Sequence, residues 1–193
     1  MPPKNKFTQA QIVAAAVELT RQKGFDAVTA RDLGAALGTS SKPVYTAFDN
    51  MSQLKEAVIL VAQKIYLRFC DEETVSGKYP AYKATGMAYI RFAREERNLF
   101  RLLFMRDRSG EAVCANDESY DNVIHIVETQ TGLDHQDANL FHAEMWIVVH
   151  GIATMFATAY MDWDMELVSR MLTDIYNGLS ASKQKEDSQE QHH

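Results

Sequence analysis

The stretch TARDLGAALGTSSKPVYTAF, residues 29–48, constrains the fold more than any other part of the sequence. Thr29 is a residue type that caps helix N-termini, and Gly38 is the type that ends helices in the left-handed conformation. Ser40 then predicts the cap of a second helix, in which its hydroxyl accepts a hydrogen bond from the Lys42 amide. The stretch therefore predicts two short helices joined by one sharp turn.

The rest of the chain continues the helical pattern. Its 193 residues hold only four prolines and nine glycines, and no Val, Ile or Thr run alternates cleanly with polar residues. A first helix is expected between a capping pair, Thr8 with Gln11, and a stop at Gly24. After the two short helices, further helices are predicted over residues 50–73, 80–96, 98–106, 118–132, 136–160 and 164–180. The sequence thus predicts an all-α fold of about nine helices.

These helices divide into two predicted domains. Residues 1–50 form a three-helix unit, and residues 51–181 form a larger helical bundle. Residues 182–193 are polar throughout and predict a disordered tail. The terminal His192 and His193 fit an expression remnant and a ligand equally well.

Charge is distributed unevenly along the chain. The net charge is −6, yet residues 1–50 hold six basic and four acidic side chains, which leaves the remaining residues with 14 basic and 22 acidic ones. The mildly basic N-terminal residues 1–50 are able to approach a polyanion even though the rest of the chain is acidic, provided that residues 1–50 face the polyanion. The acidic total therefore does not exclude nucleic acid as a partner.

Several classes of protein find no support in the sequence. No apolar segment follows the charged N-terminus as in a signal peptide, and the apolar run AVILVA at 57–62 is too short to span a membrane. We expect a cytoplasmic protein with no membrane partner. Cys70 and Cys114 lie outside any CxxC pattern, which favours reduced packing cysteines and leaves a redox sensor as the alternative.

Neither a metal site nor a catalytic motif stands out in the sequence. His142 and His150 share a helix face, but eight residues separate them by about 12 Å along the axis, which is too far for one ion. The sequence has no HExxH, no GxSxG and no phosphate-binding glycine loop. We therefore expect no metal, no cofactor, no catalytic residues and no enzyme activity.

The two short helices of residues 29–48 have the form of a helix-turn-helix. In that motif the second helix enters the DNA major groove, where polar and basic side chains reach base edges while their neighbours hold phosphates. A plain helical hairpin with a solvated polar face is the alternative. The predicted DNA-binding residues are Thr29, Arg31, Ser40, Ser41, Lys42, Tyr45, Thr46 and Lys55.

The N-terminal quarter of the chain closely resembles the DNA-binding domain of TetR-family transcriptional regulators. The resemblance is carried by an alanine-rich first helix, the sequence KGF, the cap at Thr29, LGAALG, VY followed by Phe48, and Leu54. It implies a regulator whose partner is a double-stranded DNA operator.

Two positions depart from the family pattern. Thr39 stands where an apolar residue usually follows the turn glycine, and Met51 stands where a lysine usually contacts phosphate. Lys55, one helical turn later, is expected to substitute for that lysine. Because each phosphate contact adds to the salt dependence, weaker nonspecific DNA binding is expected.

The C-terminal part resembles the ligand-sensing domain of a TetR subgroup with a Trp-His-Gly signature, here Trp146, His150 and Gly151. The resemblance implies a homodimer in which the last two helices of each subunit form a four-helix bundle. A stripe of small residues on the eighth helix supports such close packing, although packing within one subunit is the alternative. The predicted interface residues are Gly151, Thr154, Thr158, Leu172 and Ile175.

Methionines and aromatic residues are frequent in the same part of the chain. Most are expected to form core, yet pliable thioethers and flat rings also suit a cavity for an apolar or aromatic small molecule. His125, His142 and His150 are candidates for orienting a polar group of that molecule. The predicted ligand-binding residues are Met87, Phe92, Phe104, Tyr120, Phe141, Met145, Trp146 and His150.

Three functions remain open from the sequence. The first is a ligand-responsive regulator, most simply a repressor released from a palindromic operator. The second is a helical small-molecule-binding protein that has lost DNA binding, and the third is an enzyme without a recognisable motif. DNA binding that weakens steeply with salt distinguishes the first from the other two, and turnover of a ligand identifies the third.

Overall fold

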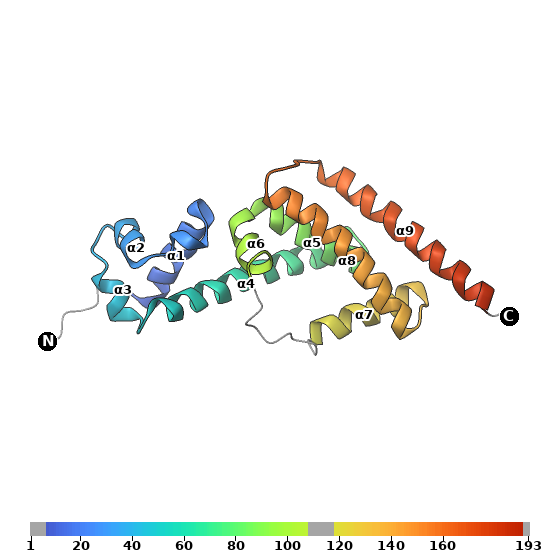
Figure 1. The fold of residues 1–193 in the computed structure, drawn as a ribbon, viewed down its shortest axis with the longest axis horizontal. Helices are drawn as coiled ribbons and strands as arrows, with labels where there is room; N and C mark the ends of the chain where they lie inside the picture. The colour runs from blue at the N-terminus through green and yellow to red at the C-terminus, as the bar shows by residue number, and fades with distance from the viewer. Residues whose placement is uncertain (1–6, 108–117, 191–193) are drawn as a thin grey trace. The chain divides into compact units, whose positions relative to one another are not determined.

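The computed structural model describes the backbone of residues 7–107 and 118–190 and the side chains of 7–107 and 120–183. Within these residues every regular element is helical, which confirms the all-α prediction (Figure 1). The helices are α1 (Gln9–Lys23), α2 (Ala30–Ala36), α3 (Lys42–Ala47), α4 (Met51–Ser76), α5 (Ala81–Glu95), α6 (Arg97–Phe104), α7 (Glu118–Thr131), α8 (His135–Ala157) and α9 (Met165–Glu190), with a 3-10 turn at Phe25–Ala27.

The chain separates into two compact units. The head unit comprises residues 1–68 and 92–107, and the body unit comprises residues 69–91 and 108–193. The chain passes from one unit to the other inside α4 and again inside α5. The predicted boundary at residue 50 encloses the helix-turn-helix, whereas the compact head unit also takes in most of α4 and all of α6.

Local caps build the first helices of the head unit. Thr8 and Gln11 form a reciprocal capping box at the start of α1, and Gly24 ends that helix at φ +86°. Asn50 caps α4 by accepting a hydrogen bond from the Gln53 amide at 2.9 Å. These contacts confirm the predicted starts of α1 and α4 and the predicted end of α1. α4 ends at Ser76, beyond the predicted end at residue 73.

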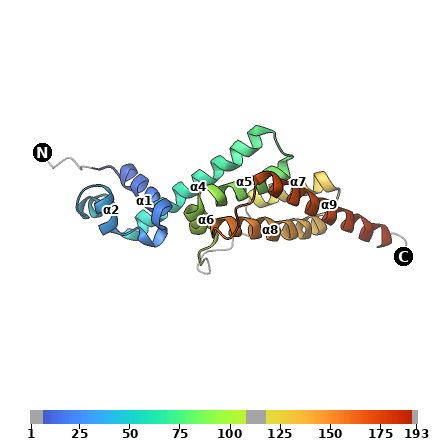
Figure 2. The same ribbon diagram turned by 90° about the horizontal axis from the view of Figure 1, so that it is seen from above.

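The head unit has a continuous apolar core. Figure 1 shows α2 and α3 near α1, and α2 packs against both of the other helices. Figure 2 shows α2 beside α1 from above. The fully or almost fully buried side chains of this core are Ile12, Ala16, Val28, Leu33, Val44, Phe48, Leu54 and Val58.

α6 belongs to the head unit through both polar and aromatic contacts. The Arg21 guanidinium of α1 donates to both carboxylate oxygens of Glu96, with Nη2–Oε1 at 2.6 Å and Nε–Oε2 at 2.9 Å. Asn98 Nδ2 donates to the Arg21 carbonyl oxygen at 2.8 Å. On α6, the Phe104 ring packs edge-on against Tyr66 of α4 at 5.2 Å between centroids.

The body unit packs α8 against α7 and α9, which lie beside it in both views (Figures 1 and 2). Its core side chains are Tyr89, Ile124, Val127, Phe141, Phe156 and Val168, each at most 1% exposed. α8 is long and apolar enough, by length and composition, to cross a membrane, which is also true of core helices in soluble proteins. Because its inward face is buried by neighbouring helices, we describe α8 as the core helix of this unit.

The C-terminal helix is longer than the sequence predicted. The backbone of α9 is helical to Glu190, so the prediction of disorder does not hold for residues 182–190. Ala, Lys, Gln and Glu in this segment are good helix formers, and a helix that is already nucleated extends through such residues at little cost. His192 and His193 lie outside the described residues, as does Cys114.

Candidate functional site

The helix-turn-helix begins with a double contact at the start of α2. The Thr29 hydroxyl accepts from the Asp32 amide at 3.1 Å and donates to Asp32 Oδ2 at 2.6 Å. The Thr29 amide donates to the Ala27 carbonyl at 2.9 Å, so it does not complete a capping box with the Asp32 carboxylate. Thr29 is therefore confirmed as the N-cap of α2, and the Asp32 carboxylate bonds to the Thr29 hydroxyl instead of the Thr29 amide.

The turn between α2 and α3 depends on a glycine that sequence reasoning missed. A Cβ atom on Gly34 would lie 2.8 Å from the carbonyl carbon and 2.9 Å from the carbonyl oxygen of Ser40. The Gly34 carbonyl also accepts from the Thr39 amide at 2.8 Å, and Gly38 adopts the predicted left-handed conformation at φ +65°. Only a residue without a side chain at position 34 lets the two helices approach this closely.

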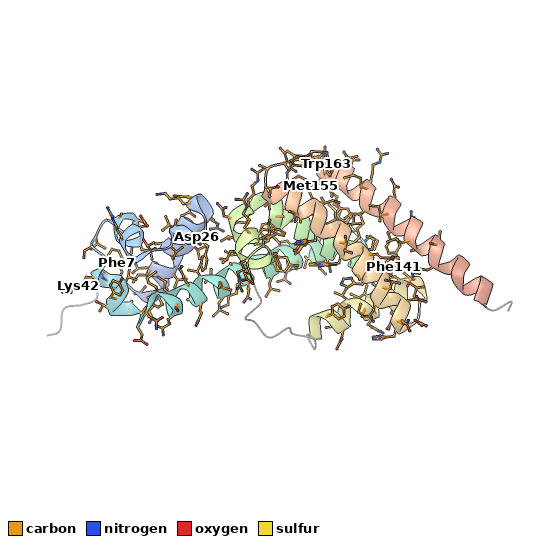
Figure 3. The ribbon with its side chains drawn as sticks, in the orientation of Figure 1. Phe7, Asp26, Lys42, Phe141, Met155 and Trp163 are labelled. Carbon is orange, nitrogen blue, oxygen red and sulfur yellow. The ribbon has the colours of Figure 1, made fainter. Side chains whose placement is uncertain are left out.

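α3 presents a polar face and buries an apolar one. Ser40 Oγ accepts from the Lys42 amide at 3.4 Å, as predicted, but the N-cap of α3 is Ser41 and not Ser40, because the helix begins at Lys42. Val44 is only 1% exposed. Lys42 and Thr46 are exposed, and Tyr45 is 62% exposed. Figure 3 labels Lys42 at the start of this helix. Val44 therefore anchors the helix and leaves its polar side chains open to a partner.

The structure brings the predicted DNA-binding residues to a small part of the head unit. Thr29 and Arg31 lie at the start of α2 and are exposed. Lys55 lies on the second turn of α4, where its ammonium group sits 5.2 Å from the centroid of the Phe25 ring. That cation–π contact holds Lys55 near the head surface. The remaining predicted residues lie on or directly before α3: Ser40, Ser41, Lys42, Tyr45 and Thr46.

The predicted ligand-binding residues do not form one cluster. Phe92 and Phe104 belong to the aromatic core of the head unit, where each contacts Tyr66 and Phe100. Three others are buried in the body unit: Met87, Phe141 and Met145, with exposed fractions of 2%, 0% and 5%. The remaining three, Tyr120, Trp146 and His150, border a row of rings on α8.

That row is formed by His142, Trp146 and His150, which follow one another at four-residue intervals. Their neighbouring ring centroids lie 6.4 Å and 6.0 Å apart, and the planes of Trp146 and His150 differ by 23°. Tyr89 of α5 adds a ring 4.8 Å from Trp146, and Tyr120 of α7 adds one 5.5 Å from His142. Figure 3 labels Phe141, the residue that precedes His142 on α8.

Two buried tyrosines hold the histidines of this row. The Tyr82 hydroxyl lies 2.9 Å from His142 Nδ1, and the Tyr89 hydroxyl lies 2.9 Å from His150 Nδ1. Burial raises the pKa of both phenols above the ordinary tyrosine value, so they stay protonated at neutral pH. Burial also lowers the pKa of His142, which favours its neutral imidazole.

The two tyrosines were missing from the sequence prediction. Tyr82 and Tyr89 are seven residues apart on α5, and His142 and His150 are eight apart on α8, so both pairs have the spacing of two helical turns. Matching tyrosine and histidine spacings on two helices were the signal available in the sequence. It required knowing that α5 and α8 pack side by side.

The predicted interface residues differ in accessibility. Gly151 has open space where a Cβ would lie, and Thr158 is exposed, immediately after the end of α8. Thr154 and Ile175 are half-buried. Leu172 is only 3% exposed and its side chain lies near Gly86 of its own subunit, so we assign it to the core of the body unit.

The exposed side of α8 carries larger apolar residues that the prediction omitted. Leu140 is 47% exposed and Ile147 is 71% exposed. With Gly151, Thr154 and Thr158 they follow helical spacings of seven, four, three and four residues, which places them in one stripe. A partly exposed stripe of small residues that carries Leu140 and Ile147 is typical of a helix that packs against another chain.

In the described part of the chain no group of three His, Cys, Asp or Glu side chains could hold a metal ion. An open polar recess of about 510 Å³ lies in the head unit and is lined by Arg21, Arg94, Glu95, Glu96, Arg97 and Asn98. It does not coincide with any predicted ligand-binding residue.

Comparison with known proteins identifies both ends of the chain. Residues 12–58 match the family model of bacterial regulatory proteins of the tetR family, and residues 82–175 match the model of a tetracyclin repressor-like C-terminal domain. An uncharacterized HTH-type transcriptional regulator of Mycobacterium tuberculosis is 24% identical over 184 residues, which cover 93% of this chain and 83% of that protein.

Proposed function

This chain belongs to the TetR family of DNA-binding transcriptional regulators, and we propose that it acts as a ligand-responsive repressor. In this proposal α3 enters the major groove of a palindromic operator, and Lys42, Tyr45 and Thr46 contact bases and phosphates. The observation that supports the proposal most strongly is the α3 face itself. Its polar side chains are exposed while Val44 is buried behind them.

The proposed repressor is a homodimer. The two recognition helices of a dimer must lie about 34–36 Å apart to enter successive major grooves on one face of DNA. The exposed stripe of α8, from Leu140 to Thr158, offers each subunit an apolar face for the other. A small molecule that binds the body unit and changes the spacing of the recognition helices would then favour release from DNA.

The proposal assigns the chain a cytoplasmic location and no catalytic step. Its effector is a small apolar or aromatic molecule bound in the body unit, where rings of α5, α7 and α8 meet. Tyr120, Trp146 and His150 are the predicted ligand-binding residues that the row of rings includes or contacts.

The first experiment selects DNA fragments from the source genome and titrates the best fragment at several salt concentrations. A palindromic fragment bound with a steep salt dependence supports the proposal. Failure to enrich any fragment, from folded and dimeric protein, favours a small-molecule-binding protein that has lost DNA binding. In that case Met51→Lys, which restores the usual family residue, is the variant to test first.

Variants of α3 test the recognition surface. Lys42→Ala and Tyr45→Phe should each weaken operator binding about tenfold, or about 1.4 kcal/mol, because both remove a group able to contact DNA. Neither should change thermal stability, since both side chains are exposed. Lys64→Ala is the matched control, because it removes an exposed lysine from the middle of α4. Equal losses in all three variants would contradict the assignment of this face.

Variants of α8 test the proposed dimer. Ile147→Asp should shift the protein toward monomer in sedimentation velocity, because a charge would enter the apolar stripe. Leu60→Asp is the matched control, since Leu60 is 58% exposed on α4 and lies outside the stripe. A dimer that survives Ile147→Asp unchanged would show that the subunits use another surface.

A further inference from the structure

The recognition helix α3 is too short to fix its own direction. Its six residues, Lys42–Ala47, span about 9 Å, and an isolated helix of this length is unstable in water. Its direction therefore depends on the contacts that it makes with the rest of the head unit. A tilt of about 10° would move one end of α3 by about 1.5 Å relative to the other. Groups that bind a partner must be held within about 0.5 Å of their productive positions.

The start and the apolar side of α3 are held by packing. α2 packs against α3, and a Cβ atom on Gly34 of α2 would lie 2.9 Å from the carbonyl oxygen of Ser40, close to the start of α3. Val44 within α3 is 1% exposed, and Phe48 directly after it is 6% exposed. Apolar burial is not directional, so it fixes the depth of a helix better than its tilt.

The last peptide unit of α3 is held at both of its polar atoms. The Phe48 amide donates to the Val44 carbonyl at 3.0 Å and closes the helix. The Ala47 carbonyl, which belongs to the same peptide unit, accepts from Gln9 Nε2 at 2.5 Å. Carbonyl groups in the last turn of a helix lack partners within the helix, and here a glutamine of α1 supplies one. Because hydrogen bonds are directional, the two bonds restrain the orientation of this peptide unit as well as its position.

The glutamine starts from a fixed part of the backbone. Gln9 is the first residue of α1 and directly follows the cap at Thr8. Thr8 and Gln11 hold this first turn reciprocally, with the Gln11 amide 3.2 Å from Thr8 Oγ1 and the Thr8 amide 2.9 Å from Gln11 Oε1. Ile12 is 0% exposed and secures the same turn to the core of the head unit. Gln9 therefore links the end of α3 to a well-anchored part of α1.

We propose that Gln9 is a positioning residue of the recognition helix, which holds the end of α3 at the angle that base contacts require. A glutamine carries no charge, so its removal leaves the electrostatic attraction to DNA unchanged. Its removal instead disturbs the base contacts of Lys42, Tyr45 and Thr46. This inference rests on the proposed function, in which α3 enters the major groove, and it adds a residue that determines sequence specificity through α3.

Affinities for two DNA fragments test the inference. Gln9→Met keeps the length of the side chain and removes its amide donor. This variant should bind the selected operator about fivefold more weakly than the wild-type chain, and should bind a scrambled fragment of the same length with an affinity within about twofold of the wild-type value. Gln22→Met is the matched control, because Gln22 is also exposed on α1 but donates to Glu18 of the same helix at 2.8 Å. It should change both affinities by less than about twofold.

The ratio of the two affinities distinguishes positioning from a direct phosphate contact. Loss of a phosphate contact weakens binding about equally across sequences. Equal losses on the operator and on the scrambled fragment in Gln9→Met would therefore overturn the proposal. An operator affinity equal to that of Gln22→Met would overturn it as well.

Hydrogen exchange without DNA distinguishes positioning from a direct base contact. The Phe48 amide, followed by NMR, should exchange about threefold faster in Gln9→Met than in the wild-type chain, because its peptide unit loses one of two restraints. Gln22→Met should leave this rate unchanged. If circular dichroism shows that Gln9→Met is misfolded, Gln9→Ala also lacks the donor and should show the same changes. An unchanged Phe48 rate in a folded Gln9 variant would overturn the inference, even if operator affinity falls.

The wild-type chain separates this inference from the proposed function. A wild-type chain that binds no DNA fragment overturns the proposed function and this inference with it. Operator binding by the wild-type chain, together with the same Phe48 exchange rate and the same affinity ratio in Gln9→Met, overturns this inference alone.

Discussion

The side-chain hydrogen bonds within the head unit and those within the body unit differ in how far apart along the sequence their partners lie. The hydrogen bonds at the helix starts of the head unit, made by Thr8, Thr29, Ser40 and Asn50, join residues two or three positions apart. The side-chain pairs of the body unit include Tyr82 with His142 and Tyr89 with His150, which are 60 and 61 positions apart. The geometry of the DNA-binding surface is therefore largely local, whereas the row of rings exists only after α5 and α8 have packed.

This difference has exceptions that limit it. Gln9 Nε2 of α1 donates to the Ala47 carbonyl at the end of α3, 38 positions away, and Arg21 pairs with Glu96, 75 positions away. Both contacts tie α1 to a helix that the caps alone would leave independent. The head unit thus uses local bonds to form its helices and a few distant ones to assemble them.

The largest effect is expected from a substitution that disrupts the local geometry of the head unit. Gly34→Ala should reduce the free energy of unfolding by about 3 kcal/mol, because its Cβ would meet the Ser40 backbone instead of a flexible side chain. Operator binding should be lost with it. Thermal unfolding and operator titration measure the two effects. Gly178→Ala, where nothing lies within 4 Å of the new Cβ, is the control, and equal stability of both variants would contradict the role of Gly34.

The next largest effect is expected from a substitution that removes a hydrogen bond between residues far apart in the sequence of the body unit. Tyr82→Phe should reduce the free energy of unfolding by about 2 kcal/mol, because the His142 nitrogen then lacks its buried donor. Tyr120→Phe removes a hydroxyl from a side chain that is 43% exposed and should change stability by less than about 0.5 kcal/mol. Urea unfolding distinguishes them, and a Tyr82 variant as stable as the Tyr120 variant would show that the pair is energetically neutral.

A cap of the head unit should contribute less than a buried pair. Thr29→Ala should lower the free energy of unfolding by about 1 kcal/mol, since the Asp32 amide loses its acceptor. Thr29→Ser keeps the hydroxyl and should restore most of the loss in the same denaturant titration. If the serine variant is as unstable as the alanine variant, the methyl group and not the hydrogen bond stabilises the start of α2.

A local defect in the body unit gives an effect of opposite sign. Ala159, just after α8, has φ +56°, whereas the left-handed positions of the head unit, Gly24 and Gly38, are glycines. Ala159→Gly should therefore stabilise the protein by about 0.5 kcal/mol. The substitution relieves the backbone strain of a left-handed alanine, and this gain exceeds the additional chain entropy that glycine loses on folding. Ala14→Gly, at an exposed position inside α1, should destabilise it by about 1 kcal/mol. Calorimetric melting of the two variants should give shifts in opposite directions.

The smallest expected effect concerns pH. Burial lowers the pKa of His142 in the folded protein, so below about pH 6.5 the unfolded chain binds a proton that the folded chain does not. The free energy of unfolding should therefore fall as the pH is lowered through this region. Urea titrations between pH 5 and pH 7.5 measure the dependence, which His142→Gln should reduce. A dependence that the substitution leaves intact belongs to other groups.

The sequence predicted the positions of the helices better than it predicted which helices pack against one another. The caps at Thr8, Thr29 and Asn50 and the contact of Ser40 with the Lys42 amide were predictable because helix geometry fixes the distance between a cap and its amide. The N-cap of α3 itself was not, since Ser41 takes that position. The helix-turn-helix and the family were predictable because many residues of the N-terminal quarter match the family pattern in a single alignment. The family models confirmed both predictions. The roles of the predicted DNA-binding residues stay predictions; six of the eight side chains are exposed, whereas Ser41 and Lys55 are half-buried.

The candidate ligand site was predicted only in part. Trp146 and His150 were named, but their partners Tyr82 and Tyr89 were not, because no spacing along one helix shows which helix will pack beside it. Phe92 was expected in the same cavity, yet it packs with Phe100 in the head unit. Leu172 was expected at an interface and is buried, since periodicity alone does not distinguish a core stripe from an interface stripe.

The discontinuous head unit has a consequence for recombination between relatives. A crossover at residue 50, or even at residue 68, would transfer the helix-turn-helix and leave residues 92–107 behind. Arg21 from one parent would then face the residue that the other parent carries at position 96, and the bidentate pair would survive only by coincidence. Under the proposed function, DNA specificity can therefore be exchanged cleanly between relatives only when residues 1–68 and residues 92–107 are inherited together.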